Sequence, residues 1–154
     1  MKRLLLVLPV ILFLGCDVAV DGVAVDDRVD VSYLLMPGME GRDLPFSSAV
    51  RVDNTLYLSG NVGNIPGTLE LAEGGIQGET QQTMENISAV LEQFDSSLDN
   101  VVKCTVFLAD IAEWGAMNEV YRTFFKNPPA RSALGVSGLA LGARVEIECI
   151  AVVN

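Results

Sequence analysis

P-P-A-R-S (Pro128 to Ser132), followed by V-E-I-E (Val145 to Glu148), places one arginine and two carboxylates on neighbouring strand-like segments near the end of the chain. A guanidinium offers a planar fork of donors that fits a carboxylate bidentately. A second, protein carboxylate nearby can orient water and transfer protons. Together the two segments predict a site for a small acid.

The second segment alternates in polarity along a predicted strand. Because successive side chains of a strand point to opposite faces, Glu146 and Glu148 share one face while Val145 and Ile147 share the other. Taken alone, this alternation favours the solvated face of a half-buried sheet over a catalytic site. The arginine and the carboxylates therefore need support from the rest of the chain.

That support comes from four blocks of sequence in a fixed order. The blocks are L-P-F-S-S-A-V-R-V-D-N-T-L-Y-L-S-G-N-V-G (Leu44 to Gly63), N-V-V-K-C-T-V-F-L-A-D-I (Asn100 to Ile111), M-N-E-V-Y (Met117 to Tyr121), and P-A-R-S with the later E-I-E-C-I-A-V. In this order they resemble the RidA/YjgF family of enamine and imine deaminases. The resemblance covers the chain from about Val29 onward, which makes it far more specific than any single motif.

Hydrophobic periodicity predicts an α+β domain over residues 29–154. Strands are expected at residues 31–35, in a hairpin at 49–59, and at 101–108, 132–136 and 144–152. Helices are expected at 78–94 and, after a capping box of Asp110 and Glu113, along a stripe that buries Trp114, Met117, Val120, Tyr121 and Phe124. Two helices can cover one face of a mostly antiparallel sheet.

The other face of this sheet has no helix to cover it, so we expect the chain to form an oligomer. The resemblance makes this expectation specific. It implies a chorismate-mutase-like (RidA-type) fold assembled as a homotrimer, with ligand clefts between adjacent subunits.

The resemblance also assigns roles to residues of this sequence. Arg131 matches the arginine that binds the substrate carboxylate, and Glu146 matches the acid that orients the hydrolytic water. The remaining substrate-binding positions are Phe46, Ser59, Gly60, Asn118 and Ala133. Phe46 replaces a tyrosine that is usual in the family, so a hydroxyl is lost there. At Ala133 the implied contact is the backbone carbonyl, and Glu148 is expected to be structural, paired with Arg144 or solvent.

These roles imply a hydrolase that needs no cofactor and no metal. A 2-imino acid would be converted to a 2-oxo acid and ammonia, with Glu146 as general acid and base. Two alternatives stay open. The chain could be a non-catalytic small-carboxylate-binding or chaperone-like module, which Phe46 favours, or a tethered assembly protein whose function is the trimer itself.

Composition excludes several other function classes. The chain has no histidine, so it lacks a Ser-His-Asp or Cys-His nucleophile and a histidine-ligated zinc. Its net charge of −10 disfavours nucleic acid as a partner. Cys104 and Cys149 fall on apolar strand faces, so we expect buried free thiols, with a disulfide between them a less favoured alternative.

The N-terminal residues predict an exported protein. Residues 1–15 carry Lys2 and Arg3 before an apolar run, which is typical of a signal peptide. The following Cys16 resembles the acylated cysteine of a bacterial lipobox, and residues 16–28 form an acidic tether. We therefore expect lipid anchoring on the periplasmic side of the cell membrane; the alternatives are secretion without lipid, and a cytoplasmic protein with a mis-assigned start.

Overall fold

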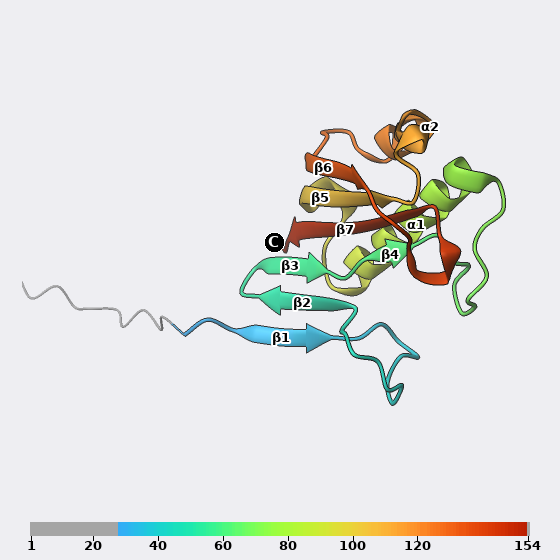
Figure 1. The fold of residues 1–154 in the computed structure, drawn as a ribbon. Coiled ribbons are helices and arrows are strands. Elements are labelled where there is room, and N and C mark those ends of the chain that lie inside the picture. Colours follow the sequence, from blue (N-terminus) through green and yellow to red (C-terminus); the bar gives the residue numbers. More distant parts are fainter. Residues whose placement is uncertain (1–27, 154) are drawn as a thin grey trace, which may run out of the picture.

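The computed structural model describes residues 28–153, which form one sheet with two helices packed against it (Figure 1). The strands are β1 (Val31–Leu34), β2 (Ala49–Val52), β3 (Thr55–Leu58), β4 (Asn61–Val62), β5 (Val101–Leu108), β6 (Ala130–Gly135) and β7 (Val145–Val152). The helices are α1 (Gly75–Gln93) and α2 (Trp114–Tyr121), with short 3-10 turns at Leu98–Asn100, Ile111–Glu113, Arg122–Phe124 and Ala140–Gly142.

The strands lie in the order β1-β2-β3-β7-β5-β6, and β4 pairs with the far end of β7. Only β5 and β6 run parallel; the other pairings are antiparallel. A parallel pair requires a crossover, and α2 lies in the segment that joins β5 to β6. The predicted α+β fold with a mostly antiparallel sheet and two helices is thus confirmed.

The core lies between the sheet and the helices. Along α1 the predicted apolar stripe is buried, and Met84, Ile87 and Leu91 are fully inaccessible to solvent. Val145 and Ile147 of β7 face this stripe and are equally inaccessible. Burying each such side chain contributes about 1.5–3 kcal/mol, so the period-2 pattern of β7 and the helical pattern of α1 fix which face of the sheet is inside.

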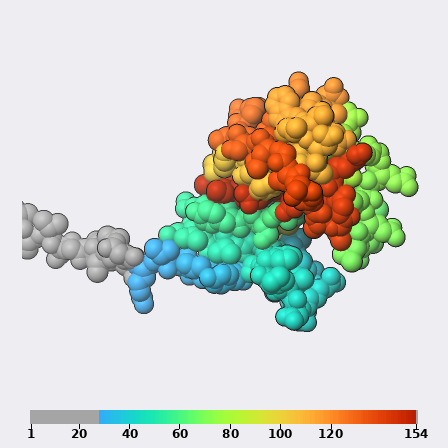
Figure 2. Space-filling view, viewed as in Figure 1, coloured from blue at the N-terminus to red at the C-terminus, as the bar shows by residue number. Residues whose placement is uncertain are grey.

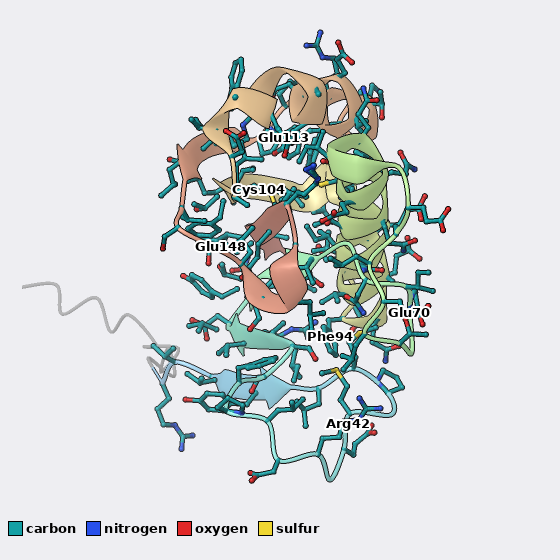
Figure 3. The ribbon with its side chains drawn as sticks, turned by 45° about the vertical axis from the view of Figure 1, so that its right-hand side comes forward. Arg42, Glu70, Phe94, Cys104, Glu113 and Glu148 are labelled. Carbon is teal, nitrogen blue, oxygen red and sulfur yellow. A yellow bond between two sulfur atoms is a disulfide. The ribbon has the colours of Figure 1, made fainter. Side chains whose placement is uncertain are left out.

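The opposite face of the sheet carries exposed aromatic side chains. Tyr33 pairs with Val50, Val50 pairs with Tyr57, and Tyr57 pairs with Ile150, so all four side chains lie on one face. Tyr33 is 75% exposed and Tyr57 is 46% exposed. We call this the open face. Figure 2 shows β1 and the loop after it at one end of the molecule, and Figure 3 shows Glu148 on the side of the sheet turned away from α1.

The expectation of two free thiols is wrong. Cys104 and Cys149 are buried as predicted, but they form a disulfide across β5 and β7 (Figure 3). The two residues are direct partners in the antiparallel register, with their Cα atoms 4.1 Å apart. Sequence patterns place each cysteine on a strand face but do not give the register that brings the two together.

The beginning of α2 also differs from the prediction. Asp110 does cap the chain, because its side chain accepts from the Ala112 amide, but Glu113 pairs with Arg144 at 3.1 Å instead of closing a capping box. Arg144 is therefore not the partner of Glu148. Trp114 was predicted to be buried and is 46% exposed, because it stands at the first position of a short helix rather than within its buried stripe.

The predicted signal peptide at residues 1–15, the lipidated Cys16 and the acidic tether lie outside the described residues, except for the last residue of the tether. Within residues 28–153, neither helix is both long and apolar enough to cross a bilayer.

Candidate active site

Arg131 lies on the helix-covered side of the sheet, at the edge formed by β6. It is the register partner of Cys104, whose side chain faces the core, so the guanidinium reaches toward α2. There its central carbon lies 4.6 Å from the centre of the Tyr121 ring and 5.9 Å from that of Trp114. Both distances are typical of cation–π contacts.

A cavity of about 400 Å³ opens beside this arginine. Its lining includes Arg131, Tyr121 and Asn118, and Asn118 is 9% exposed. Asn118 comes four residues after Trp114 and three before Tyr121, which places all three on one face of α2. The structure therefore brings together two of the predicted site residues, Arg131 and Asn118, and adds two aromatic rings.

Ala133 follows Arg131 by two residues on β6 and lies on the same face of the sheet, opposite Val106. Its side chain packs against the core, and it is not among the residues that line the cavity. We call the group of Asn118, Arg131 and Ala133 the arginine half-site.

A second group forms around Glu146 on the other side of the sheet. Glu146 pairs with Phe107 and with Val62, and its carboxylate lies directly over Gly60. A Cβ at residue 60 would overlap with Oε1 of Glu146, so glycine is required for this close approach. Within residues 28–153, the Glu146 carboxylate has no hydrogen bond or ion pair, and its oxygens are available to water or a ligand.

Ser59 connects this group to the loop that carries Phe46. The Ser59 hydroxyl donates to the carbonyl of Ser47 at 2.6 Å, and the Ser59 amide donates to the carbonyl of Ser48 at 3.1 Å. Phe46, the residue before this pair, is 53% exposed. We call the group of Phe46, Ser59, Gly60 and Glu146 the glutamate half-site.

The two half-sites do not meet within one chain. Arg131 faces the helices, whereas Glu146 lies on the open face with Phe107 as its neighbour, two strands from β6. Side chains on opposite faces of one sheet cannot bind the same small molecule. The predicted carboxylate-binding group, Arg131, and the predicted water-orienting group, Glu146, therefore lie on different surfaces of the chain.

Similarity to known proteins shows the family of this chain. A family model described as Endoribonuclease L-PSP matches residues 42–153. The chain belongs to this family, which includes RidA. It is 46% identical over 109 residues to a mouse 2-iminobutanoate/2-iminopropanoate deaminase, covering 70% of this chain and 81% of that one. To the human protein of the same name it is 42% identical over 123 residues, covering 79% and 88%.

The fold is similar to that of a solved RidA. The crystal structure of RidA from the Antarctic bacterium Psychrobacter aligns with a TM-score of 0.68 at 41% identity, covering 72% of this chain and 90% of that chain. The RidA-type fold predicted from the sequence blocks is confirmed.

Sequence patterns had assigned Trp114 and Tyr121 only to the core of this RidA-family domain. Their spacing from Asn118, at four and three residues, was the available signal for a shared helix face. What the sequence does not give is the position of β6, and hence of Arg131, against that face.

Tyr121 leads to a prediction about alkaline stability. Burial raises the pKa of Tyr121, and the positive charge of the nearby Arg131 opposes this effect in part; the resulting pKa is about 12. Between about pH 10 and 12 the unfolded chain loses this proton while the folded chain keeps it, so stability falls as the pH rises. We expect wild type to lose roughly 2–3 kcal/mol more than Tyr121→Phe over this range, measured by urea unfolding. Equal slopes for the two proteins would contradict the assignment.

Gly60 allows a direct test of the glutamate half-site. We expect Gly60→Ala to displace the Glu146 carboxylate and to lower the turnover rate roughly 100-fold or more, since small misplacements at reacting groups cost about that much. Gly138→Ala is the matched control, because a Cβ there meets no atom within 4 Å. The measurement is kcat of the deaminase reaction proposed below, and full activity of Gly60→Ala would show that this close approach is unimportant.

Proposed function

We propose that this protein is a 2-imino acid deaminase that hydrolyses reactive imines of small amino acids to 2-oxo acids and ammonia. The observation that carries the proposal is the arginine half-site, where the Arg131 guanidinium borders a cavity of about 400 Å³ without a carboxylate partner among the described residues. The mouse and human relatives, named as 2-iminobutanoate/2-iminopropanoate deaminases, support the same reaction class.

In the proposed reaction, Arg131 binds the substrate carboxylate through two in-plane N–H donors. Glu146, together with the backbone carbonyl of Ala133, holds a water molecule and takes its proton as the oxygen attacks the imine carbon. The proton then passes to the imine nitrogen, which gives a neutral carbinolamine. Glu146 next transfers the proton of the carbinolamine hydroxyl to the amino nitrogen, and the C–N bond breaks as the C=O bond forms, so that ammonia leaves and a 2-oxo acid remains. Positioning supplies most of the acceleration, because free imines already hydrolyse in water.

We propose that the site is completed between subunits of a homotrimer. The two half-sites lie on different surfaces of one chain, which fits a head-to-tail contact in which the arginine half-site of one subunit meets the glutamate half-site of the next. Such heterologous contacts close into rings, whereas a two-fold dimer joins identical surfaces. The exposed Tyr33 and Tyr57 of the open face give this assembly an apolar surface to bury.

We also propose that the chain works outside the reducing cytosol. The buried disulfide between Cys104 and Cys149 supports this location, because disulfides persist mainly in oxidising compartments. The apolar run after Lys2 and Arg3 points the same way. In this proposal Cys16 carries the lipid that holds the trimer at the membrane.

The test is ammonia and 2-oxo acid release from 2-iminobutanoate and 2-iminopropanoate, generated in situ by an amino-acid oxidase. Acceleration over the uncatalysed hydrolysis establishes the deaminase. Binding of 2-oxobutanoate without any acceleration would instead establish the carboxylate-binding module, which Phe46 in place of tyrosine favours.

A further inference from the structure

The guanidinium of Arg131 contacts aromatic rings and has no acidic partner among the described residues. Within residues 28–153, this guanidinium has no hydrogen bond and no ion pair, whereas Arg51 pairs with Asp95 and Arg144 pairs with Glu113. Its described contacts are the two ring faces, at 4.6 Å for Tyr121 and 5.9 Å for Trp114.

A ring contact leaves the arginine available to a ligand in a way that an acid partner does not. A carboxylate partner would occupy the in-plane N–H donors and neutralise the charge, and a substrate carboxylate would have to compete with it. A ring packs against the face of the guanidinium and leaves the in-plane donors unoccupied. The aromatic contact can therefore orient the guanidinium without using its donors.

Of the two rings, that of Tyr121 is fixed. Tyr121 is 5% exposed and packs on the ring of Phe125, with the ring centres 4.9 Å apart. Trp114 is 46% exposed and more distant from Arg131. A buried, packed ring restricts the guanidinium more strongly than an exposed one, because little side-chain freedom remains on either partner.

The hydroxyl of Tyr121 does not take part in this contact. It is buried and has no hydrogen-bond partner among the described residues, so it neither binds Arg131 nor reaches solvent. The ring face is thus the part of Tyr121 that acts on Arg131.

We propose that Tyr121 is a positioning residue that holds the Arg131 guanidinium in the plane in which it binds the substrate carboxylate. This inference rests on the proposed function for its kinetic consequence, but the contact itself concerns binding of any small carboxylate. Because the carboxylate is bound equally in the ground state and the transition state, loss of the ring raises KM and leaves kcat nearly unchanged.

The experiment compares Tyr121→Leu and Tyr121→Met, which lack the ring, with Tyr121→Phe, which keeps it. We expect the Kd for 2-oxobutanoate and the KM for 2-iminobutanoate to rise about tenfold in the ring-less variants, with kcat within about threefold of wild type. In Tyr121→Phe both constants return to within about twofold of wild type. Phe94→Leu, a core truncation at the far end of α1, controls for lost stability.

Each outcome decides the matter. Unchanged Kd and KM in the ring-less variants overturn the inference. It is also overturned if Tyr121→Phe binds 2-oxobutanoate as weakly as Tyr121→Leu does, or if Phe94→Leu shows the same rise in KM. If wild type binds 2-oxobutanoate but does not accelerate hydrolysis, the proposed deaminase function is overturned. The Kd values of the Tyr121 variants for 2-oxobutanoate then still test the role of Tyr121. If wild type shows neither binding nor turnover, both proposals are overturned.

Discussion

Replacing Arg131 by alanine lowers kcat/KM for 2-iminobutanoate by roughly 100-fold or more. The arginine is the group in this half-site that can pair with the substrate carboxylate, and removing one partner of a desolvated, hydrogen-bonded charge pair costs about 2–5 kcal/mol. Arg131→Lys recovers only part of the loss, because an ammonium cannot offer the bidentate fork. The measurement is steady-state ammonia release.

The matched control for this substitution is Arg42→Ala. Arg42 is exposed on the loop that follows β1 (Figure 3), at the opposite edge of the sheet from β6 and Arg131, and its loss changes the net charge by the same amount. We expect wild-type kinetics from it. If Arg131→Ala kept wild-type kcat/KM, the arginine half-site would not be the substrate site.

Removing the disulfide has the largest expected effect on stability. In Cys104→Ala/Cys149→Ala, we expect the free energy of unfolding to fall by about 2–4 kcal/mol, because the crosslink joins residues 45 positions apart and limits the unfolded chain. The corresponding decrease in Tm is about 10 °C. Deamination activity at 25 °C should persist, since neither sulfur lies in a half-site.

The same chain supplies the control for this prediction. Wild type refolded with a reductant should match the double variant, and the variant should not respond to the reductant. Alkylation of the unreduced, unfolded wild type followed by mass measurement counts free thiols directly. Two alkylated positions at Cys104 and Cys149 would contradict the disulfide.

The regular elements of this fold were predictable because they follow local patterns. The residues of β5 were predicted from Val101 to Leu108 with the bounds that the structure has. The helix expected at residues 78–94 begins three residues earlier, at Gly75, and its apolar stripe is buried as expected. Periods of 2.0 and 3.6 residues determine which side chains face the core, and local sequence contains those periods.

The contacts between elements were less accessible to sequence reasoning. The disulfide depends on the register of β5 and β7, and the aromatic contacts of Arg131 depend on how α2 lies beside β6. Neither is determined by the pattern of one segment. Trp114 illustrates the limit, since its helical spacing predicted burial, but its place at the first turn of α2 leaves it 46% exposed beside Arg131.

The sequence predicted which residues form the candidate site. It did not predict that these residues lie on two different faces of the sheet. Resemblance to the RidA family assigned Arg131 and Glu146 to one cleft, and the structure places them on opposite faces of one sheet. The expectation of clefts between subunits accounts for this division. If each cleft is shared between two subunits, the deaminase activity of mixed variants tests the assembly.

The most direct test mixes two inactive proteins, Arg131→Ala and Glu146→Gln, and allows their subunits to exchange. In a mixed trimer some clefts combine the intact Glu146 of one variant with the intact Arg131 of the other. Random mixing in equal amounts restores about one quarter of the sites, so we predict recovery of about a quarter of wild-type deaminase activity. No recovery, in a mixture whose mixed trimers are verified by mass, would contradict a site completed between subunits.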